Sequence, residues 1–270
     1  MRIEDLDAPR VRPGAAEAML EDLRWLGLDW DEGPDVGGPH GPYVQSQRTG
    51  HYERAFETLR TGGWLYPCTC SRREIAEAAS APDGDEPVYP GTCRGGATHP
   101  SRPPAWRFAL PAPPAFVDVL QGPSSPGLGA GDFVVRRADG VFAYQLAVVV
   151  DDVAMGMTDV VRGDDLRAST PRQVALYRAL GAPVPAFMHV PLVLGADGHR
   201  LGKRHGSTAL AALRAAGHPK EQIVAILAGS LGLLEPGQGP VDAASLIGAF
   251  DPARLPRAPG LIALPDRVSP

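Results

Sequence analysis

The sequence predicts an α/β protein built around a parallel sheet, with a small insertion and a helical C-terminal part. Strand-like segments alternate with helical ones along most of the chain, which is typical of β-α-β units. A stretch rich in Cys, Pro, Ser and Gly interrupts this alternation, and the last part of the chain shows only helical spacing. We therefore expect a main body at residues 1–65 and 105–206, an insertion at 66–104 and a helical part at 207–270.

The composition is that of a globular protein without membrane segments. Of the 270 residues, 44% are hydrophobic and 21% are charged, so the chain is able to bury a sizeable core. The apolar stretch at 141–150 is too short to cross a bilayer, and the acidic residues near the start argue against a signal peptide. We therefore expect a cytoplasmic protein. The net charge of −5 argues against broad non-specific nucleic-acid binding but leaves room for a local basic face.

The first part of the chain contains a strand end and two main helices. Residues 2–7 alternate in polarity before Ala8-Pro9, which predicts the end of a strand. Helical spacing follows at 15–26 and 49–61, and a glycine ends each helix. The apolar faces of these helices would consist of Met19, Leu23 and Leu26 and of Tyr52, Phe56 and Leu59. A shorter helix is expected at 72–79, inside the insertion.

The second part of the chain alternates strands and helices. Strands are expected at 106–110, 115–120, 158–162 and 190–194, and an Ala-Asp-Gly turn between 133–137 and 141–144 predicts a hairpin. Ser169 and Pro171 predict the start of a helix that runs to Leu180. Residues 145–153 are ambiguous, because their valines favour a strand while their position favours a helix. Short helices follow residue 208, with apolar spacing at Ile223, Ile226 and Leu227.

All three cysteines lie in the insertion, where they predict a metal site. Cys68 and Cys70 are too close in sequence for an easy mutual disulfide. Thiolates are natural ligands of structural zinc, which takes four ligands in a tetrahedron, and Cys93 supplies the third. The fourth would be Tyr89 or His99. A metal would also supply the folding free energy that this segment, poor in apolar residues, needs. The alternative is a set of inert thiols.

Lys203 lies in a basic, glycine-containing segment at 200–206, directly after a predicted strand and turn. It is one of only two lysines in the chain. A lysine on such a loop is able to place its charge on a phosphate group, which indicates phosphate binding. The alternative is a solvated basic turn.

Glu4, Tyr144 and Arg162 form a dispersed set of candidate binding residues. Glu4 and Arg162 lie at the ends of predicted strands, where ligands bind in open α/β sheets. A carboxylate, a phenol and an arginine together suit an amino acid, because the carboxylate attracts its ammonium group and the guanidinium fork matches a carboxylate. The alternative is that Glu4 and Arg162 pair with ordinary neighbouring charges.

Seven different short motifs follow one another between residues 2 and 206. They are Arg-Ile-Glu-Asp-Leu-Asp at 2–7, Tyr-Pro-Cys-Thr-Cys-Ser at 66–71, Tyr-Pro-Gly-Thr-Cys-Arg at 89–94, Tyr-Gln-Leu-Ala-Val-Val-Val-Asp-Asp at 144–152, Val-Arg-Gly-Asp-Asp-Leu at 161–166, Ser-Thr-Pro-Arg-Gln at 169–173 and Leu-Gly-Lys-Arg-His-Gly at 201–206. In these motifs and in their order, the chain resembles the class I glutamyl-type tRNA synthetases.

The resemblance implies a Rossmann-like catalytic domain with a zinc-bearing insertion, and it makes residues 145–153 mostly helical. The family uses ATP with Mg²⁺ to form glutamyl-adenylate and then moves the glutamyl group to RNA, which requires positioning and charge stabilisation rather than a protein nucleophile. Glu4, Tyr144 and Arg162 match its L-glutamate-binding positions, and Lys203 matches the lysine that stabilises charge on the ATP phosphates during catalysis. The implied zinc ligands are Cys68, Cys70, Tyr89 and Cys93.

Three departures from the family pattern bear on activity. The family's first strand and its His-Ile-Gly-His helix, which hold ATP, precede the segment with which this chain begins, so that either the start lies further upstream or the enzyme is decayed. Arg200 and Gly202 replace the first lysine and the serine of the phosphate loop. The residues after Gly206 are too few for the anticodon-binding region of the long members.

The third departure favours the short members of the family. These place the anticodon loop in the active site and attach glutamate to queuosine at the wobble position of tRNA(Asp). We therefore expect a monomeric ligase that uses L-glutamate, ATP and tRNA(Asp), without membrane contact. The alternatives are a truncated enzyme that charges tRNA(Glu), a non-catalytic zinc- or RNA-binding remnant, and another small adenylate-forming ligase.

Overall fold

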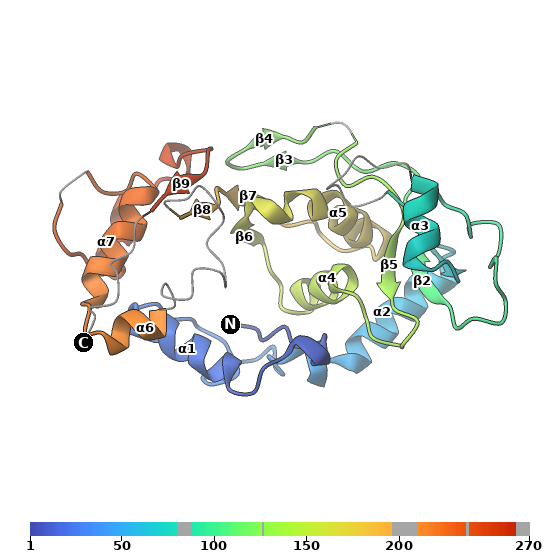
Figure 1. The fold of residues 1–270 in the computed structure, drawn as a ribbon, viewed down its shortest axis with the longest axis horizontal. Helices are drawn as coiled ribbons and strands as arrows, with labels where there is room; N and C mark the ends of the chain where they lie inside the picture. Colours follow the sequence, from blue (N-terminus) through green and yellow to red (C-terminus); the bar gives the residue numbers. More distant parts are fainter. Residues whose placement is uncertain (80–87, 126, 196–209, 236–237, 263–270) are drawn as a thin grey trace.

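The structure is a computed structural model that describes residues 1–79, 88–125, 127–195, 210–235 and 238–262. Its elements are arranged along one long axis (Figure 1). In chain order they are α1 (Ala15–Trp25), α2 (Thr49–Thr61), β1 (Leu65–Cys68), α3 (Arg72–Ala79), β2 (Ala105–Phe108), β3 (Val117–Asp118), β4 (Gly122–Pro123), β5 (Phe133–Arg136), α4 (Tyr144–Ala154), β6 (Asp159–Gly163), α5 (Thr170–Ala179), β7 (Ala186–Val190), β8 (Val193–Leu194), α6 (Leu210–Ala215), α7 (Lys220–Ser230) and β9 (Gly260–Leu261), with short 3₁₀ helices between them.

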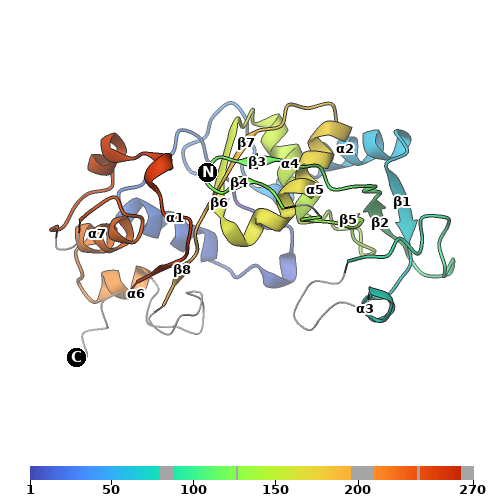
Figure 2. The same cartoon turned by 90° about the horizontal axis from the view of Figure 1, so that it is seen from above.

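A four-stranded sheet in the order β4-β3-β7-β6 forms the centre of the molecule (Figure 2). The chain passes from β6 through α5 to the parallel strand β7, as expected for a β-α-β unit, and β3 is also parallel to β7. The α/β class is confirmed. The sheet is mixed rather than parallel throughout, because the chain turns back at residues 119–121 and β4 pairs antiparallel with β3. Gly122, the first residue of β4, has a φ of 78°, which favours glycine.

A second sheet, antiparallel and in the order β1-β2-β5, joins the insertion to the main body. The rings of Phe108 and Phe133 stack on this sheet with centroids 5.3 Å apart. The predicted hairpin at 133–137 and 141–144 is only half correct. Its first strand is β5, but the returning segment makes a single bridge, between Arg136 and Phe142, because Tyr144 already begins α4.

The ambiguous residues 145–153 belong to α4, which lies between α2 and α5. All the side chains from Leu146 to Asp152 are buried. A helix that is covered on several sides has no long polar face, so its sequence is as apolar as that of a buried strand. The core of the main body forms around this helix, with Tyr52, Phe56 and Leu59 of α2 on one side.

Most of the predicted helix positions are confirmed, but two side-chain details are wrong. α2 covers the predicted 49–61, α3 the predicted 72–79, and α5 ends just before Gly181. Met19 on α1 is 59% exposed, because this helix contacts the C-terminal helices through Leu26, which directly follows it, and not through Met19. Ser169 does not cap α5 with its side chain, since its hydroxyl accepts a hydrogen bond from Gln145.

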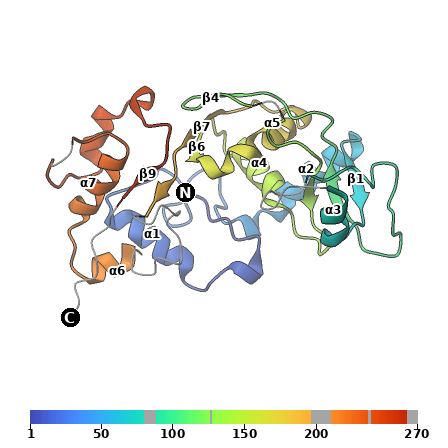
Figure 3. The ribbon, with the colours of Figure 1, turned by 45° about the horizontal axis from the view of Figure 1, so that its top comes forward.

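The C-terminal helices pack against the N-terminal one (Figure 3). Leu26, Leu213, Ile223 and Val224 form a small core, and Arg214 pairs with Glu21 and Asp22 of α1. Residues from the two ends of the chain therefore share one hydrophobic cluster. The four-part division of the chain stays a prediction. In the described residues, no helix is long and apolar enough to cross a membrane.

The carboxylate of Asp151, near the end of α4, is fully buried and connects this helix to α2. It accepts hydrogen bonds from Arg48 Nε (2.6 Å), Gln45 Nε2 (2.8 Å) and Tyr52 Oη (2.9 Å). Arg48 is also buried, and its Nη1 donates to the carbonyl of Pro42 at 2.8 Å. The loop before α2 is thus fixed against α4 through one ion pair and its hydrogen bonds.

Removing the charge of Asp151 should destabilise the fold strongly. Asp151→Asn leaves the buried Arg48 guanidinium without its counter-ion, and loss of one partner of a buried pair costs about 3–5 kcal/mol. Urea denaturation followed by circular dichroism measures the change. The control is Asp139→Asn, which removes the exposed pair with Arg137 and should cost less than about 1 kcal/mol. Equal losses in the two variants would contradict the structural role of Asp151.

Candidate functional site

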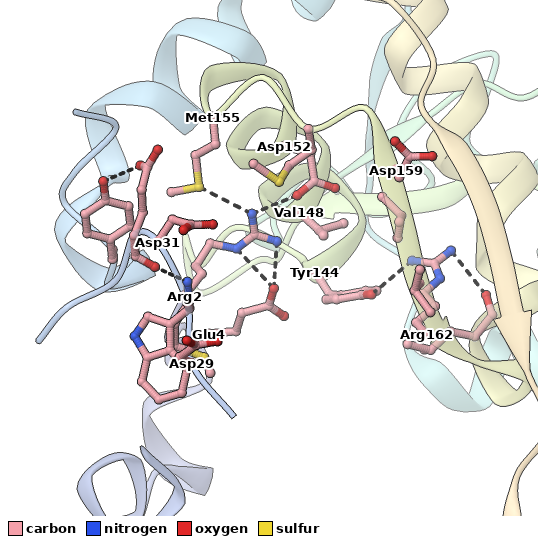
Figure 4. A pocket seen from close by; sticks show the side chains of 18 residues that line it. Arg2, Glu4, Asp29, Asp31, Tyr144, Val148, Asp152, Met155, Asp159 and Arg162 are labelled. Carbon is pink, nitrogen blue, oxygen red and sulfur yellow. Dashed lines mark hydrogen bonds and ion pairs between the residues drawn. The ribbon is translucent and has the colours of Figure 1, made fainter. Parts of the chain in front are cut away.

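A cavity of about 750 Å³ lies between the N-terminal segment, α4 and β6 (Figure 4). Arg2 and Glu4 enter it from the N-terminal segment, Tyr144 from the start of α4, and Arg162 from β6. Glu4, Tyr144 and Arg162 therefore line one cavity, and their role in binding glutamate stays a prediction. They come together because the extended N-terminal segment pairs through Ile3 with Val44, which lies just before α2.

Four hydrogen-bonding contacts hold the Arg162 guanidinium, one of them from Nη2 to the Leu166 carbonyl at 3.5 Å. Its Nη2 donates to Thr170 Oγ1 at 2.8 Å, its Nε donates to His189 Nε2 at 3.0 Å, and its Nη1 lies 3.5 Å from Tyr144 Oη. Within the described residues, Arg162 forms no ion pair with a carboxylate. Its charge is therefore available to an anionic group that enters the cavity.

Tyr144 stands beside Arg162 at the first residue of α4. Burial raises the pKa of Tyr144 above its ordinary value of 10.0, and the nearby Arg162 charge only partly opposes this shift. The phenol is therefore protonated at neutral pH and can donate a hydrogen bond. Its position next to the guanidinium provides a second donor for the same anionic group.

Glu4 lies on the opposite side of the cavity, where Arg2 orients it. Arg2 Nη2 is 2.9 Å from Glu4 Oε1, and Arg2 Nη1 donates to Asp152 Oδ1 at 2.7 Å. Burial disfavours the charge of Arg2, but Asp152 and Glu4 outweigh it and raise the pKa of Arg2 further. Unlike Arg162, Arg2 is thus already paired with carboxylates.

The cavity wall is rich in acidic groups. The carboxylates of Asp29, Asp31, Glu32 and Asp159 line it together with those of Glu4 and Asp152. A zwitterion with an additional carboxylate would find attraction for its ammonium group on this acidic side and for a carboxylate at Arg162. The arrangement suits the recognition of an acidic amino acid and offers no serine, cysteine or lysine nucleophile among the described lining residues.

A second cavity, of about 490 Å³, lies on the other side of Tyr144, against the insertion. Arg72, Tyr89, Arg107 and Arg172 line it together with Tyr144. The Arg107 guanidinium lies over the Tyr89 ring at 3.8 Å from the centroid, and its buried Nε has no hydrogen-bond partner among the described residues. Tyr144 is therefore a wall shared by an acidic cavity and a basic, aromatic one.

The three cysteines come together in the insertion, beside Tyr89. Their sulfur atoms lie within 4.8 Å of one another, and Tyr89 Oη is 3.3 Å from Cys68 Sγ and 3.5 Å from Cys70 Sγ. Sulfurs bound to one tetrahedral zinc ion lie about 3.8 Å apart. Burial raises the pKa of Cys93, but hydrogen bonds from the backbone of Thr98 and Thr69 outweigh burial and lower it to about 5. These four donors fit a structural zinc ion.

His99, the other candidate for the fourth ligand, is engaged elsewhere. Its Nε2 lies 2.9 Å from Glu74 Oε1, and its backbone N–H donates to Thr69 Oγ1. Its ring therefore contacts a carboxylate rather than the cysteine cluster. The geometry favours Tyr89.

Comparison with known proteins places the chain in a family. A family model described as "tRNA synthetases class I (E and Q), catalytic domain" matches residues 1–239. The chain belongs to this family. A member is an aminoacyl-tRNA synthetase-like ligase of α/β fold, so the predicted class of enzyme is confirmed.

The relatives of this class I synthetase are of two kinds, glutamyl-Q tRNA(Asp) synthetases and glutamate–tRNA ligases. The glutamyl-Q tRNA(Asp) synthetase of Symbiobacterium thermophilum is 56% identical over 96% of this chain and 84% of that protein. A glutamate–tRNA ligase of Anaeromyxobacter sp. (strain Fw109-5) is 45% identical over 83% of this chain and 49% of that protein. The crystal structure of a glutamate tRNA ligase from Elizabethkingia meningosepticum, in complex with its amino acid, has a TM-score of 0.79 at 25% identity and covers 97% of this chain and 60% of that chain.

The sequence of this class I synthetase did not indicate every side chain that lines or supports the cavity. Arg2 was part of a matched motif but received no role, although residues 2 and 4 share one side of an extended segment. His189 and its partner Asp118 were missed, because nothing in their local sequence indicates that they meet behind Arg162. Lys203, the predicted ATP-binding residue, lies outside the described residues.

Proposed function

We propose that this chain uses ATP to activate L-glutamate and then transfers the glutamyl group to queuosine at the wobble position of tRNA(Asp). The observation that carries the proposal is the convergence of Glu4, Tyr144 and Arg162 on one cavity within a class I synthetase catalytic domain. The choice of acceptor rests on the relatives, since identity to the glutamyl-Q tRNA(Asp) synthetase is higher and extends over more of this chain.

In the first step, Arg162 and Tyr144 hold the side-chain carboxylate of glutamate, and Glu4 attracts its ammonium group. The α-carboxylate attacks the α-phosphorus of ATP, so that an acyl–phosphate bond forms and pyrophosphate leaves. Mg²⁺ and Lys203 would stabilise the charge on the phosphates. The protein accelerates such a step by positioning the reactants and stabilising charge, which agrees with the lack of a nucleophile among the described residues of the cavity.

In the second step, a hydroxyl of queuosine attacks the activated carbonyl, loses its proton and displaces AMP. The second cavity is the place that we assign to this nucleoside, because Tyr144 lines both this cavity and the glutamate cavity. Aromatic faces stack on bases, and the three arginines would attract the phosphates of the anticodon loop. The partners are thus L-glutamate, ATP and tRNA(Asp), and we propose that the chain acts as a cytoplasmic monomer.

Zinc, as a structural ion, would be held by Cys68, Cys70, Cys93 and Tyr89. Cys68 and Cys70 precede α3 and Tyr89 and Cys93 follow it, so a bound ion would hold these two segments together and supply folding free energy. Cys68 ends β1, which belongs to the same antiparallel sheet as β5. The metal would in this way fix the Tyr89 and Arg72 wall of the second cavity relative to Tyr144.

The test of the proposed activity is glutamate-dependent ATP–pyrophosphate exchange without tRNA. It is measured on this chain and on a version extended by the upstream codons, so that the result does not depend on where the reading frame begins. We expect exchange with glutamate and none with glutamine or aspartate. Exchange in neither version would contradict the proposal and favour a non-catalytic remnant, and exchange that requires tRNA(Glu) would favour a glutamate–tRNA ligase.

In the same assay, Arg162→Ala should raise the KM for glutamate about 30-fold or more, because it removes a charged partner of the substrate carboxylate. The KM for ATP should change less than about threefold. Arg167→Ala is the control, since Arg167 lies five residues further along and pairs with Asp164 outside the cavity lining. If both substrates lost affinity equally, Arg162 would be structural rather than a glutamate ligand.

Arg72→Ala should weaken transfer without affecting activation. The variant removes one cation from the second cavity, so we expect the KM for tRNA(Asp) to rise about threefold or more and its dependence on salt to fall by about one unit of log–log slope. Pyrophosphate exchange should stay unchanged. Arg73→Ala is matched in charge and helix but does not line the cavity. An equal effect of both variants would remove the support for RNA binding there.

The zinc assignment predicts one ion per chain in freshly purified protein, measured by inductively coupled plasma mass spectrometry. Tyr89→Phe should lower zinc affinity about tenfold or more, because it removes one of four ligands, whereas His99→Ala should leave it unchanged. A stoichiometry well below one in the unmodified chain would contradict the metal site. The reverse order of the two variants would make His99 the fourth ligand.

A further inference from the structure

Behind Arg162, a buried histidine and a buried aspartate form a pair to which the two proposed reaction steps assign no role. His189 on β7 and Asp118 on β3 are almost completely inaccessible to solvent. His189 Nδ1 lies 2.5 Å from Asp118 Oδ2, and His189 Nε2 lies 3.0 Å from Arg162 Nε. The register of β6 and β7 places Arg162 directly opposite His189.

The hydrogen bonds determine which nitrogen of His189 carries the proton. Asp118 Oδ1 accepts the backbone N–H groups of Leu120 (3.0 Å) and Gln121 (2.8 Å), and Oδ2 accepts that of His189 (3.1 Å), so this carboxylate is ionised and is an acceptor only. The Nδ1 of His189 must therefore donate. The guanidinium of Arg162 is a donor only, so the Nε2 of His189 must accept from it. Thr170 Oγ1, which accepts from Arg162 Nη2, lies 3.1 Å from the same Nε2 and is able to donate its own proton to it. The ring is neutral, with its proton on Nδ1.

The same bonds leave one edge of Arg162 for a ligand. Its Nε is bound to His189, and its Nη2 donates to Thr170 and lies 3.5 Å from the Leu166 carbonyl. Nη1, whose contact is Tyr144 Oη at 3.5 Å, faces the cavity. The guanidinium is thus held from behind and cannot rotate away from the cavity without breaking two hydrogen bonds.

A neutral ring in this position also preserves the positive charge of Arg162. If a carboxylate contacted Arg162 directly, it would compete with the substrate carboxylate for the same cation and neutralise it. Asp118 fixes the orientation of the imidazole, and the imidazole fixes that of the Arg162 guanidinium. The ring also keeps the Asp118 carboxylate out of direct contact with Arg162. Such a spacer is what a site needs when an arginine must be rigid but unpaired before the substrate arrives.

We infer that His189, held by Asp118 as the neutral Nδ1–H form, is a positioning residue that orients Arg162 and keeps its charge available for the carboxylate of the substrate. This inference rests on the proposed function for the identity of that substrate. Its own content is the chain of contacts from Asp118 through His189 to Arg162, in which Arg162 lines the cavity while His189 and Asp118 do not.

Two variants test the hydrogen bonds of the two His189 ring nitrogens one at a time. His189→Gln places an amide oxygen where Nε2 stood, so it retains an acceptor for Arg162. His189→Asn places an amide N–H where Nδ1 stood, so it retains the bond to Asp118 but loses that acceptor. Isothermal titration with L-glutamate should show an affinity within about threefold of the unmodified protein for the first variant and a loss of about tenfold or more for the second.

The two steady-state constants distinguish positioning from a structural defect. In pyrophosphate exchange, His189→Asn should raise the KM for glutamate with little change in kcat or in the KM for ATP, whereas a folding defect lowers kcat for all substrates together. Equal glutamate affinity in the unmodified protein and His189→Asn would overturn the inference alone. No glutamate binding by the unmodified protein would overturn the proposed function and, with it, this inference.

Nitrogen NMR provides a test that does not depend on any variant folding. In ¹⁵N-labelled protein, the ring of His189 should show a protonated Nδ1 and an unprotonated Nε2 at neutral pH. Burial and the charge of Arg162 lower the pKa of His189 below 6.5, against the opposing effect of Asp118, so this pattern should persist as the pH falls below that value. A ring protonated on Nε2 at neutral pH would overturn the inference.

Discussion

The buried ion pair between Asp151 and Arg48 holds α2 and the loop before it against α4, the helix around which the core and the cavity are arranged. It lies near the C-terminal end of α4, where the helix dipole disfavours negative charge. The fold compensates with three donors, from Gln45, Arg48 and Tyr52, all in or just before α2. Because an unpaired charge at this depth is costly, α2 and the loop that precedes it have only one favourable position against α4.

The next residue of α4, Asp152, connects the helix to the N-terminal segment that lines the cavity. Asp152 points to a different side of α4, about 100° around the axis, where it accepts hydrogen bonds from Arg2 and Tyr177. Arg2 in turn pairs with Glu4, while Tyr144 at the other end of α4 stands beside Arg162. One helix thus determines where the acidic side and the basic side of the cavity lie, and α5 and β7 hold Arg162 from behind.

Elements with strong local signals could be predicted from the sequence, such as α2 between its periodic apolar face and Gly62, whereas features set by distant contacts could not. Propensity favoured a strand for α4, because burial on all sides removes the polar face that identifies a helix. Glu4, Tyr144 and Arg162 were singled out because they match the glutamate-binding positions of the family that the motifs resemble, since their chemistry alone also suited ordinary charge pairs. His189 and Asp118 were not, since only the register between β6 and β7 and the pairing of β3 bring them behind Arg162.

The transfer of radiolabelled glutamate to RNA shows directly which nucleic acid this chain uses as the acceptor. The protein is incubated with ATP, Mg²⁺ and labelled glutamate in the presence of tRNA(Asp) that carries queuosine, of unmodified tRNA(Asp) or of tRNA(Glu). We expect label to become attached only to the tRNA that carries queuosine. Label on tRNA(Glu), or equal label on both forms of tRNA(Asp), would contradict this expectation.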